Sequence, residues 1–235
     1  RGVVEEVLGP VGQGKEAKIV LARRRDGGYA VLKIFYPVPV RFTKSRYGYL
    51  LGDPRFRTVK VSDQLHLVEL WCRKEFGNLA RAYEAGVRVP RPYGFYRNVL
   101  AMEFIGVGRD PAPTLADLGL ENVEDPEALF HEVLKNLEKT YVVAGLVHGD
   151  LSPFNILYDG ERPWIIDWGS AVRRGHPKEY EYLRRDVERI LEFFQTPLDP
   201  HGLFRKLVER GSWRGPVEVD DEGWVVVGGK RILDE

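Results

Sequence analysis

The beginning of the chain alternates apolar and polar positions with the period of two that is typical of β-strands. Residues 3 to 36 carry this alternation, for example at Ala17, Ile19 and Leu21, and side chains two positions apart lie on the same face of a strand. The Asp-Gly-Gly sequence at residues 26–28 separates two such runs and is typical of a hairpin turn. The pattern therefore predicts an antiparallel sheet in this part of the chain.

Further along the chain the apolar positions change to helical spacing. Over residues 65–85 they recur every three or four positions, and Gly86 ends the predicted helix. A second amphipathic helix is predicted for residues 127–144, ended by Gly145. A third helix is predicted for residues 177–195.

Strands are predicted between and after these helices. We expect a strand in NVLAMEFIG (residues 98–106), a hairpin in NILYDGERPWII (residues 155–166) and a terminal hairpin in EVDDEGWVVVGGK (residues 218–230). A linker near residues 105–115 separates a strand-rich half with one helix from a helix-rich half. Two lobes joined by a linker leave a cleft between them, where ligands commonly bind.

Composition narrows the class of protein. The chain has 235 residues, of which 43% are hydrophobic, and its 35 basic residues balance 35 acidic ones. A neutral balance argues against a bulk polyanion as partner. The single cysteine, Cys72, has no intrachain disulfide partner, which fits a reducing compartment. No apolar run approaches the roughly 18 residues of a membrane span, and no signal peptide is visible in this sequence, which starts at Arg1 rather than Met. We therefore expect a cytoplasmic protein without a membrane partner.

Three polar residues lie around the predicted hairpin at residues 155–166. Asp150 precedes Asn155 by five positions, and Asp167 follows Asn155 by twelve. Because hairpin strands pair through their turn, Asn155 and Asp167 are expected at the same end, where an amide oxygen and a carboxylate suit Mg²⁺. Asp150 on the preceding loop is placed to accept a proton or orient a hydroxyl. Each residue alone would more simply cap a turn or end a strand, but the D-x-x-x-x-N spacing is that of a kinase catalytic loop and predicts phosphoryl transfer.

Two further charges point to the same chemistry. Lys33 is the only charged residue in the apolar run YAVLKIFY, and Glu75 lies four positions from both Trp71 and Leu79 on the inward stripe of its helix. Each charge would be costly to bury alone, so we predict that Lys33 and Glu75 pair, with the lysine directed at nucleotide phosphates. The alternative is that Lys33 reaches solvent from a strand edge and Glu75 is solvated.

The glycine-rich segment GPVGQGKEAKIV (residues 9–20) adds a weaker signal. Glycines let the backbone approach a phosphate closely, and turn N–H groups bind anions. The spacing is not that of a Walker A loop. His148, next to the predicted catalytic loop, is interpreted as a structural histidine rather than a base or ligand.

Together these motifs resemble those of the RIO-type atypical serine/threonine protein kinases, over nearly the whole chain. The matching segments are GKEA (14–17) for the phosphate loop, LKIF (32–35) for the strand lysine, RKEFGNLARA (73–82) for the helix glutamate, LAMEFIG (100–106) for the adenine hinge, HGDLSPFNIL (148–157) for the catalytic loop, IIDWG (165–169) for the metal-binding loop and HPKEYEYLRRDVERILEFF (176–194) for the closing helix.

The resemblance implies an α+β, bilobal protein-kinase-like fold. Its strand-rich N-lobe would span residues 1–105, and its reduced helical C-lobe, without a full activation loop, would span residues 106–235. The implied cofactors are ATP and Mg²⁺ or Mn²⁺. The implied site residues are Asp150 and Asp167 for catalysis, Asn155 and Asp167 for the metal, and Gly12, Gly14, Lys15, Glu16, Lys33, Glu75, Met102, Glu103 and Ile105 for the nucleotide.

RIO kinases are linked to maturation of the small ribosomal subunit, and some act mainly as ATPases. The resemblance therefore implies the pre-ribosomal small subunit, its proteins or its RNA as partners, and an aspartyl-phosphate on the residue that matches Asp167. The segment RFTKSRYGYLLGDPRFR (41–57) resembles the flexible loop of the first RIO subfamily. We predict that residues 42–63 are mobile without a partner. Gln13 stands where the family often has Ser or Thr, so a hydroxyl contact to phosphate at that position is in doubt.

Other kinase-like proteins share part of this pattern. Small-molecule phosphotransferases of the aminoglycoside or choline type also show HGDL, Asn and IDW. The GKEA segment and the 45 residues from Ile105 to Asp150, too few for a substrate-binding insertion, argue against them. The small kinase of the tRNA threonylcarbamoyladenosine machinery lacks the long basic loop. A pseudokinase would be expected to lose Lys33, Asp150 or Asp167, and all three are present. Oligomeric state is not predicted.

Overall fold

The computed structural model describes residues 2–14, 16–37, 49, 53, 55 and 64–234. Lys15 lies outside the described residues, and so does its predicted contact with phosphate. The predicted mobility of residues 42–63 likewise lies outside them, apart from three isolated positions.

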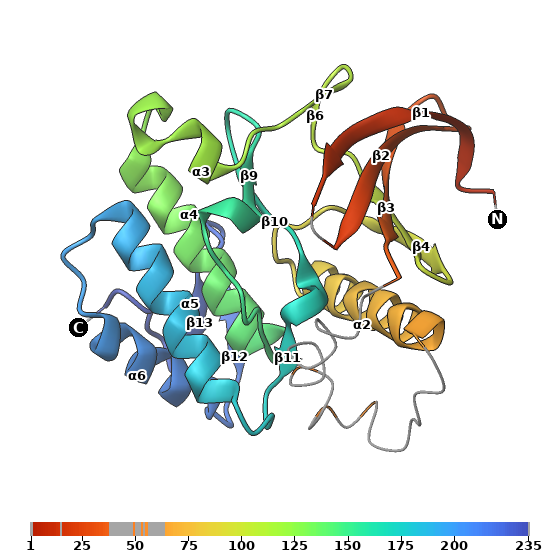
Figure 1. Cartoon of the computed structure of the whole chain (residues 1–235). Coiled ribbons are helices and arrows are strands. Elements are labelled where there is room, and N and C mark those ends of the chain that lie inside the picture. The colour runs from red at the N-terminus through yellow and green to blue at the C-terminus, as the bar shows by residue number, and fades with distance from the viewer. Residues whose placement is uncertain are drawn as a thin grey trace.

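The strands expected near the N-terminus form one antiparallel sheet (Figure 1). Its five strands run in the order β1-β2-β3-β5-β4, and they comprise β1 (Val4–Gln13), β2 (Ala17–Arg24), β3 (Tyr29–Phe35), β4 (Pro92–Tyr96) and β5 (Val99–Glu103). Residues 26–28 make the predicted turn between β2 and β3, which pair with Ile19 opposite Lys33. Strand β4 was not predicted, because its sequence PYGFY lacks a regular alternation.

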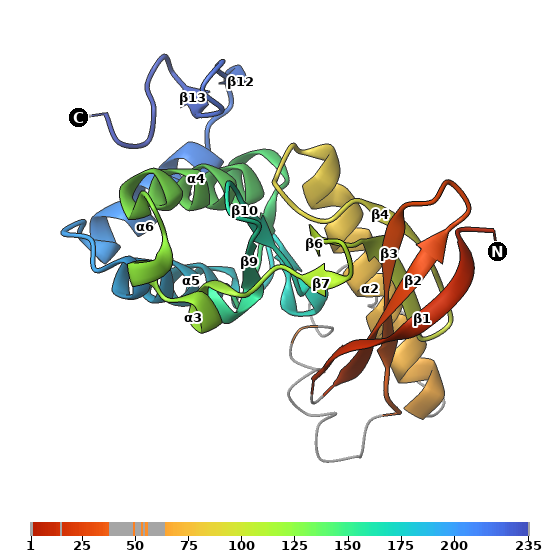
Figure 2. The same ribbon diagram turned by 90° about the horizontal axis from the view of Figure 1, so that it is seen from above.

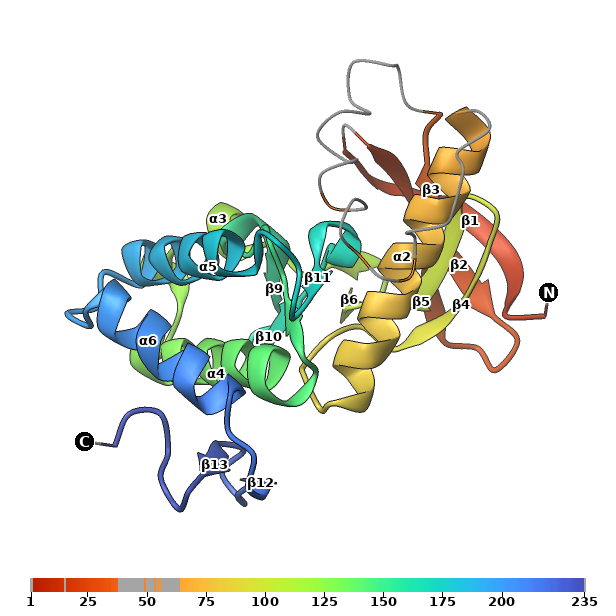
Figure 3. The same cartoon turned by 90° about the horizontal axis from the view of Figure 1, so that it is seen from below.

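Helix α2 (Gln64–Glu84) confirms the first predicted helix and lies along one side of the sheet (Figures 1 and 3). Its apolar stripe, which includes Leu67, Trp71 and Leu79, is buried. Gly86 ends it with φ of 73°, a left-handed conformation that glycine adopts without strain. The helix contacts strands β4 and β5 of the sheet and also residues 168–170 of the second half.

The connection between the two halves is more ordered than the predicted linker. Residues 106–111 form a small hairpin of β6 (Gly106–Val107) and β7 (Asp110–Pro111), followed by α3 (Leu115–Leu118) and the 3-10 helix η2 (Leu120–Asn122). Figure 2 shows this hairpin between the sheet and the helical half.

Three longer helices build the second half. They are α4 (Pro126–Glu138), continued by the π-helical turn η3 (Lys139–Val143), α5 (Glu179–Phe194) and α6 (Pro200–Gly211). The predicted helix at 127–144 therefore forms, but its last turn widens. Helix α6 was not predicted, although its start could be recognised in the sequence. Asp199 is its N-cap and accepts hydrogen bonds from the N–H groups of His201 and Gly202, and Pro200 is its first residue.

Short elements lie between the sheet and these helices. In chain order they are β8 (Leu146–Val147), η4 (Pro153–Asn155), β9 (Ile156–Tyr158), β10 (Pro163–Ile165), η5 (Trp168–Ser170) and β11 (Val172–Arg173). The predicted terminal hairpin forms as β12 (Val217–Val219) and β13 (Val225–Val227). Within the described part of the chain no helix is both long and apolar enough to cross a membrane.

One buried apolar cluster joins α2, the short elements and the helices α4 to α6. The α+β architecture with a sheet half and a helical half confirms the expected fold class. The domain boundary at residue 105 stays a prediction.

Candidate active site

A cavity of about 720 Å³ opens between the sheet and the β9–β10 hairpin. Eight of the predicted site residues line it, namely Gly12, Gly14, Glu16, Lys33, Met102, Glu103, Ile105 and Asp167. Glu75 lies behind Lys33, and Asp150 and Asn155 do not line the cavity wall. Strand and hinge residues of the sheet half and Asp167 of the helical half therefore line the same cavity.

Lys33 is the electrostatic centre of this cavity. Its ammonium donates to Glu75 Oε1 at 2.8 Å and to Asp167 Oδ1 at 3.0 Å. Burial by itself would lower the pKa of Lys33, but the charges of Asp167 and Glu75 outweigh it and hold that pKa above its ordinary value. The predicted Lys33–Glu75 pair is therefore present, and Lys33 remains a cation at neutral pH.

Asp167 ends the predicted hairpin in a strained conformation. Its backbone has φ of 62° and ψ of 66°, a left-handed conformation that is costly for a residue other than glycine. Partial desolvation by the surrounding cavity walls would raise the pKa of its carboxyl group, but the Lys33 cation outweighs it and holds that pKa below its usual range. The side chain is 46% exposed, so an ionised carboxylate faces the cavity.

The hairpin brings Asn155 beside Asp167, as predicted from strand pairing. The N–H of Ile166 donates to the Asn155 carbonyl at 3.0 Å, and the side-chain amide of Asn155 donates to the Asp150 carbonyl at 2.8 Å. That second bond fixes the amide nitrogen and leaves the amide oxygen to other ligands. Asn155 thus connects the loop that carries Asp150 to the end of the hairpin that carries Asp167.

Helix α5 holds the loop that carries Asp150, through residues that sequence reasoning missed. The buried carboxylate of Asp186 accepts the N–H groups of Gly149 at 2.7 Å and Leu151 at 2.9 Å. Burial raises the pKa of Asp186 to about 7, although these two donors oppose the shift. A charge within an apolar helical stripe is the signal that had identified Glu75, and Asp186 offered the same signal.

His148 has the structural role expected of it. The ring is buried against Trp168, and Nε2 lies 3.0 Å from the carbonyl oxygen of Ile166. Burial lowers the pKa of His148 below its ordinary value, although the Ile166 carbonyl and nearby carboxylates oppose the shift. We interpret His148 as a neutral side chain that supports the hairpin.

Several apolar residues of the cavity were also missed. They share the alternation of the predicted site residues along their strands, and they include Ile19, Val31 and Leu157. Val31 lies two positions before Lys33, Leu157 lies two positions after Asn155, and Ile19 pairs with Lys33 across the sheet. The alternation of residues along these strands could therefore have predicted the apolar wall of the cavity.

The group of metal-binding side chains is small. Within the described residues, no three His, Cys, Asp or Glu side chains gather as a metal site. Asp167 and Asn155 supply one carboxylate and one amide oxygen. This donor set fits Mg²⁺, which protein sites commonly hold through one or two carboxylates, with water and substrate phosphates as the other ligands.

Comparisons with known proteins identify the family of the chain. The RIO domain matches residues 18–203. The chain is 42% identical over 195 residues to the RIO-type serine/threonine-protein kinase Rio1 of Haloferax volcanii, covering 83% of this chain and 65% of that protein. It is 35% identical over 195 residues to the human serine/threonine-protein kinase RIO1, covering 83% of this chain and 34% of that protein.

Solved structures show the same fold. The Rio2 kinase of Chaetomium thermophilum, solved as an ADP/Mg²⁺-phosphoaspartate complex, matches 90% of this chain and 63% of that chain with a TM-score of 0.65 and 27% identity. The chain thus spans at most about two thirds of the length of these relatives. The RIO domain match covers most of the chain, and together with the Rio1 relatives it shows that the chain belongs to the RIO family.

Proposed function

We propose that this chain binds ATP with a divalent metal in the cavity and transfers the γ-phosphoryl group as a RIO-type protein kinase or ATPase. The observation that carries the proposal is the Lys33 ammonium held between Glu75 and Asp167 at the cavity wall. A cation fixed in this way can bind phosphate oxygens without reorganising.

The apolar part of the cavity is proposed to hold the adenine ring. The wall includes Ile19, Val31 and Met102 beside the backbone of residues 103–105. The N–H of Glu103 already donates to the Arg91 carbonyl at 2.8 Å. We therefore expect the Glu103 carbonyl and the Ile105 N–H to meet the base edge.

The polar part is proposed to hold the phosphates and the metal. Gly12, Gly14 and Glu16 line the cavity at the β1–β2 turn, close to Lys33. Asn155 and Asp167 would hold Mg²⁺ or Mn²⁺, which neutralises phosphate charge when bound. Lys33 orients the phosphate chain toward Asp167.

The proposed chemistry uses the two aspartates differently. A carboxylate oxygen of Asp167 attacks the γ-phosphorus, the bond to the bridging oxygen breaks, and ADP leaves. Water then attacks the aspartyl-phosphate, Asp150 accepts its proton, and phosphate leaves with the carboxylate restored. Lys33, the proposed phosphate ligand, binds the Asp167 carboxylate at 3.0 Å, and the phosphoaspartate in the Rio2 complex supports this step by analogy.

Labelling with γ-phosphate-labelled ATP tests the proposal. We expect slow, metal-dependent ATP turnover without a protein substrate, and a hydroxylamine-labile phosphate on the protein. Asp167→Ala should abolish both, whereas Asp150→Ala should impair chemistry and leave nucleotide binding largely intact. Label found only on serine or threonine, with turnover that needs an added protein, would leave a hydroxyl-directed kinase mechanism instead.

The physiological partner is proposed from the resemblance alone. It is the small ribosomal subunit or its precursor, encountered in the cytoplasm. Free aminoglycosides and choline should not be phosphorylated, because the short stretch between Ile105 and Asp150 is taken up by the β6–β7 hairpin, α3, η2, α4 with η3, and β8, with no inserted substrate-binding helices. ADP release in stoichiometric dependence on such a compound would support the small-molecule phosphotransferase alternative.

A further inference from the structure

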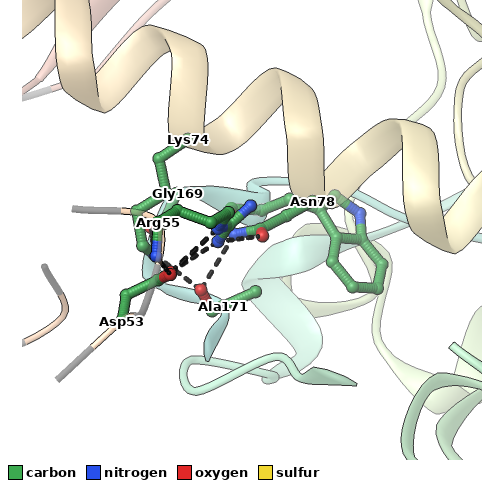
Figure 4. Close-up of polar contacts among 7 residues, drawn as sticks. Asp53, Arg55, Lys74, Asn78, Gly169 and Ala171 are labelled. Atoms are coloured by element: carbon green, nitrogen blue, oxygen red, sulfur yellow. Dashed lines mark hydrogen bonds and ion pairs between the residues drawn. The ribbon is translucent and has the colours of Figure 1, made fainter. Parts of the chain in front are cut away.

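Beyond the Lys33–Glu75 pair, α2 carries a second polar residue that reaches the active site from behind. Lys74 is fully buried, and its ammonium donates to the carbonyl oxygens of Gly169 and Ala171, each at 2.6 Å (Figure 4). These carbonyls belong to the turn that directly follows Asp167. A buried ammonium is costly unless it has partners, so the lysine and this turn depend on each other.

Asn78 lies four residues after Lys74 on α2 and binds the same backbone segment after Asp167. Its side-chain amide donates to the carbonyl oxygens of Trp168 at 3.0 Å and Ala171 at 2.8 Å. Its own carbonyl oxygen accepts from Arg55 Nη2 at 2.8 Å, and the same nitrogen lies 2.6 Å from a carboxylate oxygen of Asp53. The Asp53–Arg55 pair therefore holds the amide oxygen of Asn78, while the amide nitrogen binds the turn (Figure 4).

Gly169 lies two positions after the reactive Asp167, and its carbonyl accepts from Lys74. A side chain is not tolerated at this position, because a Cβ at Gly169 would lie 2.8 Å from Trp71 Nε1. Lys74 and Asn78 of α2 thus hold the backbone that directly follows Asp167, a residue whose own backbone is strained and needs such support.

We propose that Lys74 and Asn78, braced by Arg55, are positioning residues that set the Asp167 carboxylate for its metal. The inference rests on the proposed function, in which Asp167 is a metal ligand. A packing role alone would not require a buried polar nitrogen with two hydrogen bonds, since an apolar side chain of similar length fills the same volume without desolvating a hydrogen-bonding group. Groups that orient a metal ligand from behind typically change metal affinity or activity by about 10- to 100-fold when removed.

Metal titration tests this proposal without requiring turnover. Mn²⁺ binding is measured on the whole chain saturated with ADP, for wild type, Asn78→Ala, Arg55→Ala and the double variant. We expect Asn78→Ala to raise the Mn²⁺ dissociation constant roughly tenfold, with ADP affinity in the absence of metal unchanged. Arg55→Ala should raise the Mn²⁺ dissociation constant less. In the double variant it should add nothing to the effect of Asn78→Ala, because Arg55 acts by holding Asn78.

The matched control is Arg231→Ala. Arg231 makes a comparable carboxylate pair at 2.8 Å with Asp220 and Glu222, far from the cavity on the C-terminal hairpin. If Asn78→Ala fails to fold, the comparison of Arg55→Ala with this control tests the inference.

Two outcomes would overturn the inference. One is equal Mn²⁺ affinity in Arg55→Ala and Arg231→Ala, and the other is a loss of metal-free ADP binding as large as the loss of Mn²⁺ binding. A wild-type chain that binds Mn²⁺ with ADP yet never turns over ATP would instead refute the proposed function, and the titration would still decide on positioning.

Discussion

The guanidinium of Arg189 donates to the carboxylate of Asp150, with 2.7 Å between Nη1 and Oδ1. Arg189 lies on α5, and both side chains are partly exposed at the surface of the molecule. The neighbouring Arg185 binds the carbonyl of Gly149 on the same loop. Helix α5 therefore fixes both the backbone and the carboxylate of the loop that carries the proposed proton acceptor.

Removal of Arg189 should impair chemistry more than nucleotide binding. Arg189→Ala frees the Asp150 carboxylate to rotate, and we expect kcat for ATP turnover to fall by roughly three- to tenfold. KM for ATP should stay near wild type, because Arg189 does not line the cavity. Arg184→Ala is the control on the same helix, since Arg184 pairs only with the exposed Glu188 at 3.8 Å among the described ion pairs. Equal kcat values in the two variants would show that Arg189 does not position Asp150.

Lys33→Ala tests the cation of the cavity. It removes the proposed phosphate contact, so kcat/KM for ATP should fall by at least about tenfold, near 1.4 kcal/mol. Lys18→Ala on the neighbouring strand provides the control, because Lys18 is exposed outside the cavity. Circular dichroism must show a folded variant, since Glu75 loses its partner. Unchanged turnover in folded Lys33→Ala protein would remove Lys33 from the proposed role.

The burial of His148 predicts a pH dependence of stability. Its pKa in the folded state lies below the ordinary value of about 6.5, so the unfolded chain binds a proton more readily. The stabilisation is complete above about pH 6.5 and is lost as pH falls from that value toward the lowered pKa. Urea unfolding of wild type and His148→Gln between neutral and mildly acidic pH measures it. The variant should show a shallower decline of the free energy of unfolding, and parallel curves would contradict the prediction.

A buried ion pair joins helices α4 and α6, and its arginine also binds the C-terminal hairpin. Glu138 of α4 is fully buried against Arg210 of α6, and Arg210 also donates to the Val225 carbonyl at 2.7 Å. Arg210→Ala leaves that carboxylate without its partner, so the free energy of unfolding should fall by about 3–5 kcal/mol. ATP turnover at low temperature should persist, because neither residue lines the cavity. The double variant Glu138→Leu/Arg210→Met should recover stability, and failure to recover would assign the loss to the Val225 contact.

The pattern of the chain alone determined strands β1, β2, β3 and β5 of the sheet, the helix α2 and the hairpin that brings Asn155 to Asp167. These features depend on local periodicity and turn residues, which neighbouring positions encode. The pairing of Lys33 with Glu75 was also readable, because a charge within an apolar run needs a partner. Helix α6 was missed even though the sequence contains a helix start signal, because the N-cap residue Asp199 and the following Pro200 mark its beginning.

Only the tertiary structure decided how Asp167 and Asp150 are held. Lys74 and Asn78 reach the backbone after Asp167 across 95 and 90 positions, and Arg189 reaches Asp150 across 39. Sequence spacing carries no record of such contacts, because they depend on how α2 and α5 pack against the short elements between them. The kinds of reactive group are therefore readable from local sequence, whereas their orientation follows from long-range packing, in which buried polar groups must find partners that the chain order does not reveal.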